Sequence, residues 1–153
     1  MSRGFVGAGI KSDPYVLSNK IINTTSYYGI YINYTDAYFV IRDCEFSSTY
    51  SGGYDIYVDH VSNGQFINNT IYTRQETGIY LRYVNDTSVV DSTITSLIIP
   101  TIYVGQVAMQ TVSTYNLILF NNTITGTYQG INLNRCYNTQ IEYNNVSSTS
   151  TKD

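Results

Sequence analysis

The sequence predicts an all-β protein, folded as a single-stranded right-handed parallel β-helix (a β-solenoid) of about six rungs. The first observation behind this prediction is a six-residue pattern in which two apolar positions flank a small polar residue. The pattern occurs six times, beginning at Val16, Ile41, Phe66, Val89, Leu119 and Ile141. The second observation is a strand-like motif, such as Ile30-Tyr31-Ile32, that precedes five of these repeats by ten or eleven residues.

Alternation along each strand predicts which residues stack into columns. Successive side chains of a strand point to opposite faces, and parallel rungs place equivalent residues about 4.8 Å apart. An apolar column is expected to fill the interior, and it contains Ile21, Phe46, Ile71, Ile94, Ile124 and Val146. A small polar column is expected at a corner, because Asn tolerates left-handed backbone and bonds neighbouring peptide groups. It contains Asn19, Cys44, Asn69, Ser92, Asn122 and Asn144.

The repeat divides the chain into three parts. We expect an N-terminal cap or lead-in at 1–13, the β-helix at 14–146 and a polar C-terminal tail at 147–153. Phe5, Val6 and Ile10 are expected to cover the apolar end of the first rung. Residues 96–107 interrupt the repeat with an apolar insertion, which either folds back onto the coil or forms a lateral contact surface.

Composition narrows the function classes. Only 12% of the residues are charged and the net charge is −3, so no basic stripe for nucleic acid is present. No apolar run approaches the roughly 20 residues of a membrane span. The two cysteines, Cys44 and Cys136, should lie about four rungs apart, beyond the ~7 Å reach of a disulfide, so two free thiols are expected.

The segments beginning Ser12-Asp13-Pro14 and Asp36-Ala37-Tyr38, together with the Gly-Ile-Tyr-Leu and Asn-Asn-Thr-Ile repeats, carry a family resemblance. They resemble archaeal parallel β-helix repeat proteins of the NosD-like group, within the broad pectate-lyase-like superfamily. The resemblance implies the fold and an exported protein. It does not imply one activity, because this superfamily includes enzymes, tailspikes and surface proteins.

Metal and cofactor sites are not predicted. The NosD label would imply copper, which requires clustered His, Met or Cys ligands. His60, Met109 and the two cysteines are instead scattered over separate rungs. We therefore expect neither a metal nor another cofactor.

Carboxylates offer weak catalytic candidates. Sugar hydrolysis uses two of them, and Asp43 and Asp91 occupy equivalent positions two rungs apart, roughly 9–10 Å, with Asn68 between them. Glu45 lies nearby. Because Asp and Asn are also common corner residues, a structural role is favoured and no catalytic residue is assigned.

Asp59 and Arg82 share an outward column on adjacent rungs, which predicts a surface ion pair.

An outward column of tyrosines is the most suggestive binding feature. Tyr31, Tyr57 and Tyr80 should form a flat, rigid strip on three successive rungs. Such a strip stacks on sugar rings, packs against another protein, or simply stabilises its own sheet.

Six sequons for N-glycosylation also occur in the chain. Their acceptor residues are Asn23, Asn33, Asn68, Asn85, Asn121 and Asn145.

The leading functional interpretation is a non-enzymatic, exported structural or adhesive protein at the cell surface. The last rung has no evident cover in the sequence, so we expect contact with further copies, stacked end to end into a filament, or with another surface protein. The alternative is a polysaccharide-binding module or polysaccharide-active enzyme that uses an outer face.

Overall fold

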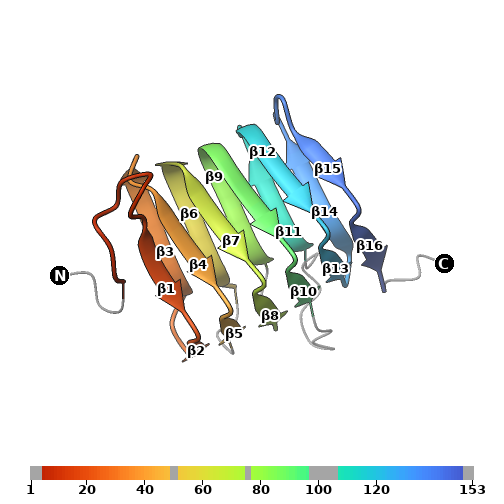
Figure 1. Cartoon of the computed structure of the whole chain (residues 1–153). Helices are drawn as coiled ribbons and strands as arrows, with labels where there is room; N and C mark the ends of the chain where they lie inside the picture. Colours follow the sequence, from red (N-terminus) through yellow and green to blue (C-terminus); the bar gives the residue numbers. More distant parts are fainter. Residues whose placement is uncertain (1–4, 49–51, 75–76, 97–106, 150–153) are drawn as a thin grey trace.

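The computed structural model describes residues 5–48, 52–74, 77–96 and 107–149, and the regular elements in these ranges are all strands. The strands coil into a parallel solenoid of about five turns, with the termini at opposite ends (Figure 1). The predicted parallel β-helix is therefore confirmed, and its rungs appear as six stacked strands in one of the sheets.

Three faces run along the solenoid. The first face contains β3 (Tyr28–Thr35), β6 (Tyr54–Ser62), the first half of β9 (Thr77–Val90), β11 (Val107–Val112) and β14 (Gln129–Asn134). The second face contains β1 (Tyr15–Ser18), β4 (Phe39–Arg42), β7 (Gly64–Ile67), the second half of β9, β12 (Tyr115–Phe120) and β15 (Gln140–Glu142). The third face contains β2 (Ile21–Thr24), β5 (Glu45–Ser48), β8 (Thr70–Thr73), β10 (Thr93–Ser96), β13 (Thr123–Gly126) and β16 (Asn145–Ser148).

Left-handed residues turn the chain from one face to the next. The non-glycine residues with positive φ fall into three columns, two between the first and second faces and one between the second and third. Asn and Asp are frequent there because their short polar side chains tolerate this conformation. The column before the third face holds Asn19, Asp43, Asn68, Asp91, Asn121 and Tyr143.

The interior column is confirmed from Phe46 to Ile124 and departs from the prediction in the first and last rungs. Phe46, Ile71 and Ile94 are fully buried and stack in register. The residue that stacks on Phe46 is Ile22, whereas Ile21 pairs with Glu45 and is 72% exposed. The prediction for Ile21 is therefore wrong by one position. At the other end of the column, Val146 pairs with Ile124 but is exposed.

The polar column needs the same correction. Asn19 occupies the left-handed column beside Asp43, so Lys20 is the first-rung equivalent of Cys44. From Cys44 onward the predicted column is present and buried, except that Asn144 in the last rung is partly exposed. The residues of this column do not adopt the left-handed backbone conformation, which is found instead at the residue before them in each rung.

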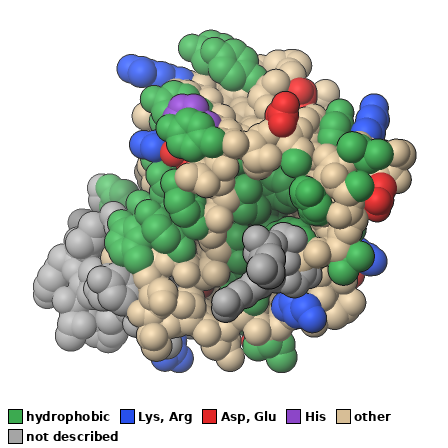
Figure 2. All heavy atoms as spheres, turned by 90° about the vertical axis from the view of Figure 1, so that its left-hand side faces the viewer, with side chains coloured by type: hydrophobic (Ala, Val, Ile, Leu, Met, Phe, Trp, Pro, Cys, Tyr) green, Lys and Arg blue, Asp and Glu red, His purple; other side chains and the backbone are tan. Residues whose placement is uncertain are grey.

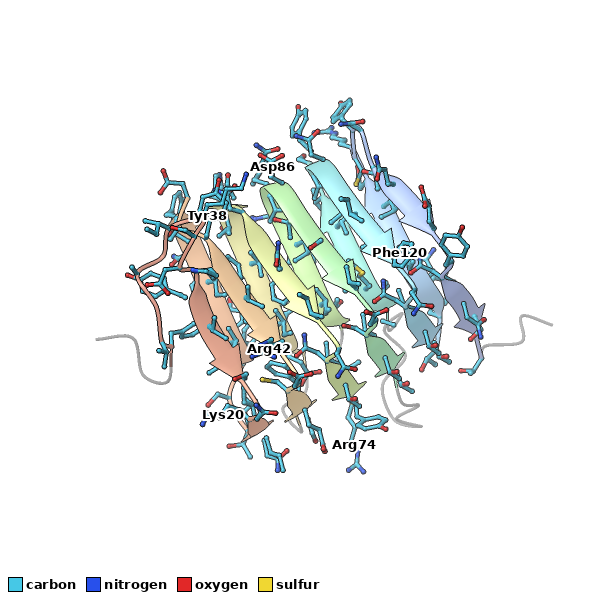
Figure 3. All side chains as sticks on the ribbon, viewed as in Figure 1. Lys20, Tyr38, Arg42, Arg74, Asp86 and Phe120 are labelled. Carbon is cyan, nitrogen blue, oxygen red and sulfur yellow. The ribbon has the colours of Figure 1, made fainter. Side chains whose placement is uncertain are left out.

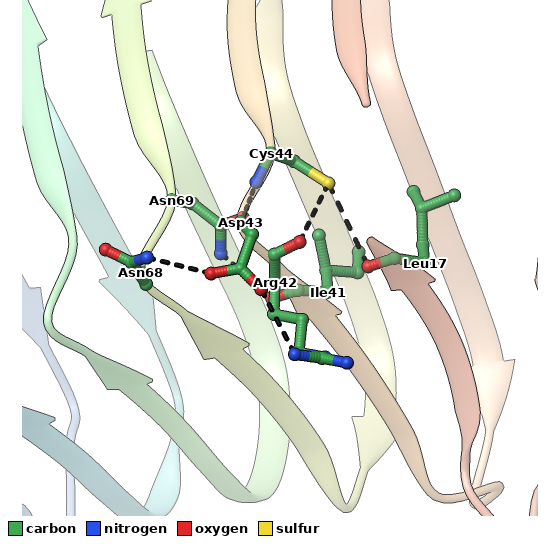
Figure 4. A network of polar contacts seen from close by, with 7 residues as sticks. All are labelled: Leu17, Ile41, Arg42, Asp43, Cys44, Asn68 and Asn69. Atoms are coloured by element: carbon green, nitrogen blue, oxygen red, sulfur yellow. Dashed lines mark hydrogen bonds and ion pairs between the residues drawn. The ribbon is translucent and has the colours of Figure 1, made fainter. Parts of the chain in front are cut away.

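Amide groups connect the rungs through this polar column (Figure 4). Asn69 Oδ1 accepts a hydrogen bond from the Cys44 backbone N–H at 3.1 Å, and Asn69 Nδ2 donates to the Ile41 carbonyl at 2.9 Å. Asn122 repeats this pattern, accepting from the Ser92 N–H and donating to the Val89 carbonyl. On the rung between them the Ser92 hydroxyl accepts from the Asn69 N–H and donates to the Val90 carbonyl of its own rung. Each side chain thus satisfies backbone groups that the turn leaves without a ladder partner.

Asp55 lies inside the solenoid. It stands in a column whose other members are Gly29, Gly78, Ala108 and Gly130. A Cβ added at Gly78 would lie 3.0 Å from Ile94 Cγ2, so this column faces the core. The Asp55 side chain is 1% exposed, and neither carboxyl oxygen accepts a hydrogen bond of ordinary geometry. Burial raises its pKa to about 7, an effect that the nearby Thr73 side chain partly offsets.

The N-terminal end has a partial cover. Val6 forms an antiparallel bridge with Val16, and Phe5 packs against the core. Val6 and Ile10 are 76% and 55% exposed, so the prediction that their side chains cover the first rung is wrong. An apolar hollow of about 280 Å³ remains in this end face, where hydrophobic side chains surround a recess (Figure 2).

The C-terminal end is less covered. β16 continues to Ser148, so the strand includes the first two residues of the expected polar tail. Leu133, Ile141 and Val146 are 40–46% exposed, although their counterparts in the preceding rung are buried.

Three further predictions can be placed on the structure. Residues 97–106, most of the insertion, lie outside the described residues. Cys44 is buried and Cys136 half-buried, and both are free, which confirms the prediction of two thiols. The described residues include no helix long and apolar enough to cross a membrane.

Candidate binding surface

The first face carries a cluster of tyrosines that extends the predicted column. Tyr31, Tyr57 and Tyr80 are in register on β3, β6 and β9, as the sequence indicates. A second column beside them contains Tyr28 and Tyr54, which pair directly. Tyr27 joins the cluster through contacts with both of the latter. We call these six residues the tyrosine cluster.

The rings of the cluster pack in a tilted arrangement and not as a flat strip. The centroids of Tyr31 and Tyr57 are 5.3 Å apart with the planes at 70°, and those of Tyr57 and Tyr80 are 5.1 Å apart at 41°. Tyr28 stacks on Tyr31 at 17°. The ring quadrupoles favour both the edge-to-face geometry of Tyr31 and Tyr57 and an offset stack such as that of Tyr28 and Tyr31. The flat strip expected from the sequence is therefore wrong, and part of each ring surface contacts a neighbouring ring.

Exposed surface nevertheless remains at one side of the cluster. Tyr31 and Tyr27 are 46% and 42% exposed, whereas Tyr57 and Tyr80 are half-buried. Tyr31 also lines the apolar hollow at the N-terminal end, together with Phe5 and Tyr15. The cluster thus continues into a recess, which gives it concave as well as convex surface.

Partial burial keeps the phenol groups protonated. It raises the pKa of Tyr57 to about 12 and raises the pKa values of Tyr28 and Tyr80 as well. Near neutral pH these hydroxyls are uncharged and can both donate and accept hydrogen bonds.

An ion pair borders the cluster and is less exposed than the sequence suggested. Asp59 is 3% exposed and accepts two hydrogen bonds from Arg82, at 2.9 Å from Nε and 2.7 Å from Nη2. His60 Nδ1 lies 2.8 Å from the same carboxylate, and its ring stacks on Tyr34. The hydrogen bonds from Arg82 hold the pKa of Asp59 below its usual value. Because the two opposite charges are paired, this edge of the cluster carries little net charge.

The weak catalytic candidates do not form a facing pair. Asp43 accepts a hydrogen bond from Asn68 Nδ2 at 2.8 Å and contacts Arg42 Nη1 at 3.2 Å. Asp91, two rungs away, accepts one from Asn121 Nδ2 at 2.7 Å. Each carboxylate thus accepts a hydrogen bond from the asparagine at the equivalent position of the next rung, as expected for a structural column.

Glu45 shares a shallow groove of about 320 Å³ with Asp43, Asn68 and Lys20. This groove lies at the turn between the second and third faces, and Asp91 is not among its lining residues. The three carboxylates therefore do not converge on one described site.

The sequons have different surroundings. Asn23, Asn33 and Asn145 are exposed on strands, and Asn85 is half-buried. Asn68 and Asn121 are exposed, but their side-chain amides donate to Asp43 and Asp91. Glycan attachment at those two positions would break the turn hydrogen bonds.

Metal-ligand geometry gives no further site in the ranges that the structure describes, where no three His, Cys, Asp or Glu side chains come together. His60 and Met109 lie on different strands, and Met109 is fully buried.

Comparison with known proteins identifies the class to which this solenoid belongs. Residues 6–152 match the family model described as a right-handed β-helix region. The match covers nearly the whole chain, so the chain belongs to this family, in agreement with the parallel register of its strands. No curated protein and no solved structure shows a significant match.

Proposed function

We propose that this protein is a non-enzymatic binding solenoid that holds an uncharged polysaccharide against the tyrosine cluster. The observation that carries the proposal is the collection of six tyrosines on one outer face, with exposed rings beside an apolar hollow. Tyrosine combines a flat apolar surface with a hydroxyl and loses little conformational entropy on binding. Sugar rings, which present apolar C–H faces and hydroxyl edges, match that combination.

Charge favours a neutral ligand over an acidic one. The charged groups that influence the phenols among the described residues are Arg82 and Asp59, and these two are paired with each other. An acidic polysaccharide would instead require unpaired Lys or Arg side chains at the contact.

The separation of the carboxylates supports a binding role over a catalytic one. Hydrolysis needs two carboxyl groups facing one glycosidic bond. Asp43 and Asp91 each bond an asparagine at the turn, away from the tyrosine cluster. The polysaccharide-active enzyme therefore remains the less supported alternative.

Affinity electrophoresis through gels that contain soluble polysaccharides tests the proposal. Neutral glucans, mannans and xylans should retard the native protein, and retardation should weaken about tenfold in Tyr31→Ala, a loss near 1.4 kcal/mol. Tyr143→Ala is the control, because Tyr143 is 78% exposed but lies outside the cluster. Lack of retardation by every neutral polysaccharide would refute the proposal.

End-to-end assembly is a second candidate, and the last rung motivates it. Leu133, Ile141 and Val146 are exposed there, and β14, β15 and β16 have edges that pair with no further strand among the described residues, so this end can pair with another copy. Light scattering across a concentration series should then show oligomers that Val146→Lys abolishes. A constant monomer mass would exclude this candidate.

Export and glycosylation belong to the same proposal, since resemblance to NosD-like proteins suggests an extracytoplasmic setting. The exposed Asn23, Asn33 and Asn145 are the acceptors whose modification disturbs no hydrogen bond of a turn. Mass spectrometry of protein purified from its native source should find glycan there in preference to Asn68. The reverse distribution would contradict this part of the proposal.

A further inference from the structure

The third face presents a regular array of hydroxyl groups that the tyrosine cluster does not involve. Its strands β8, β10 and β13 carry the sequences Thr70-Ile71-Tyr72, Thr93-Ile94-Thr95 and Thr123-Ile124-Thr125, and β16 continues with Asn145-Val146-Ser147. The three isoleucines are fully buried. The residues on either side of each isoleucine therefore point outward.

These outward residues form two straight columns. One contains Thr70, Thr93, Thr123 and Asn145, and the other contains Tyr72, Thr95, Thr125 and Ser147. Neighbours within a column are one rung apart, about 4.8 Å, and the two columns are separated by two residues of strand, about 6.6 Å. We call this two-dimensional grid the hydroxyl array.

The hydroxyl array is positioned by rigid structure. All of its strands pair in parallel and in register with no offset between neighbours. Threonine is restricted at χ1 by its branched Cβ, which fixes both the hydroxyl and the methyl group. At the C-terminal end of the array the Thr125 and Ser147 hydroxyls lie 3.1 Å apart and hydrogen-bond to each other, so the rung spacing of the hydroxyls applies to the threonines before this pair.

The four strands of the array carry no charge, although Glu45 of β5 pairs with Thr70 at the edge of the array. None of the outward residues of β8, β10, β13 or β16 is ionisable as an acid or a base near neutral pH. The second face instead mixes charged and apolar side chains without a repeating type, as Arg42 and Phe120 illustrate (Figure 3). Glu142 and the exposed Ile118 lie on the same face. Charged groups organise their own hydration shells, whereas a grid of hydroxyls and methyls can order water in its own pattern.

We infer that the hydroxyl array binds the surface of ice. Its two spacings are close to the oxygen repeats along the two principal directions of hexagonal ice, so waters bound by successive threonines can join the crystal lattice. The partner is thus a crystalline array of water molecules and not a discrete ligand. The array acts independently of the tyrosine cluster, which lies on another face.

Ice-recrystallisation inhibition and thermal hysteresis of the intact protein test this inference. Thr123→Lys introduces a charge at an exposed position of the array, and Gln65→Lys introduces the same charge at an exposed position of β7 on the second face. The inference predicts that the native protein and Gln65→Lys inhibit ice growth equally. Thr123→Lys should need about tenfold more protein, the change that corresponds to roughly 1.4 kcal/mol.

A gain-of-function variant separates the inference from damage to the fold. Tyr72→Thr replaces the one aromatic member and adds a threonine to the array, so it should inhibit ice growth more strongly than the native protein. Circular dichroism melts establish that all variants are folded. The inference is overturned if the native protein neither shapes nor inhibits ice, if both lysine variants act alike, or if crystalline polysaccharide is bound and ice is not.

Discussion

Replacing Asp55 by alanine should stabilise the protein, and the gain should depend on pH. The Asp55 carboxyl is buried without a hydrogen-bond partner of ordinary geometry, and its pKa is raised from 3.8 to about 7. At intermediate pH the folded chain therefore keeps a proton that the unfolded chain releases. Below about pH 4 Asp55 is protonated in both states and does not alter the free energy of unfolding. Between about pH 4 and pH 7 the free energy of unfolding falls as the pH rises, and above pH 7 it stays at the lower value.

The size of this effect follows from the shift. A change from 3.8 to about 7 is about three pKa units, which corresponds to roughly 4 kcal/mol of destabilisation once the carboxyl is ionised. Alanine fits the position, because Ala108 occupies the same column. The lost packing around the shorter side chain costs the same at every pH, so the pH-dependent part isolates the charge.

Urea unfolding followed by circular dichroism measures both parts. The free energy of unfolding of Asp55→Ala relative to the native protein should increase by about 4 kcal/mol between about pH 4 and pH 8. Asp36→Ala, which removes an exposed carboxyl, is the control and should show little such change. A pH-independent difference, or an Asp55→Ala protein that is less stable than the native one at high pH, would refute this reasoning.

Three other predictions concern the polar column, the buried ion pair and the thiols. Asn69→Ala should lower the free energy of unfolding by about 2–4 kcal/mol, because it leaves buried backbone groups such as the Cys44 N–H without a hydrogen-bond partner. A loss too small to resolve by urea unfolding would contradict this prediction. Asp59→Asn should lower the free energy of unfolding by about 2 kcal/mol at neutral pH, because it weakens the charged hydrogen bonds with Arg82. The loss should shrink below about pH 4, where acid protonates the Asp59 carboxylate of the native protein, and a loss that does not vary with pH would count against the ion pair. In thiol titration of the native protein Cys136 should react before Cys44, whose burial raises its pKa, and equal rates would show that Cys44 is accessible.

The sequence predicted the coil and most of its register because the interior columns are chemically uniform. The error in the first rung has a simple cause. Val16 and Leu17 are both apolar, as are Ile21 and Ile22, so the repeat fits there at two offsets. The structure selects the offset that buries Leu17 and places Ile22 on Phe46.

The binding surface was only partly predictable. The single column of Tyr31, Tyr57 and Tyr80 followed from strand alternation. The tilts of these rings depend on packing against Tyr28 and Tyr54, which lie outside the strand motif used for the prediction. The sequence did contain a signal for this second column, because Tyr28 and Tyr54 each stand two residues before the first isoleucine of the strand motif.

The interior position of Asp55 also had a signal in the sequence. Gly29, Gly78 and Gly130 hold the equivalent place in three other rungs, which indicates a crowded, inward-facing column. Strand alternation alone would place Asp55 outward with Tyr57. The local turn of the backbone that reverses this direction could not be deduced from the pattern.

The central claim is that the tyrosine cluster is the binding surface for an uncharged polysaccharide. Its most direct test is an NMR titration of protein carrying isotope-labelled tyrosine rings with a neutral polysaccharide that retards the chain. The ring signals of Tyr31, Tyr57 and Tyr80 should shift together and saturate, while the signal of Tyr143 stays in place. Saturable shifts of Tyr143 alone, or no shift in the three cluster residues, would contradict the claim.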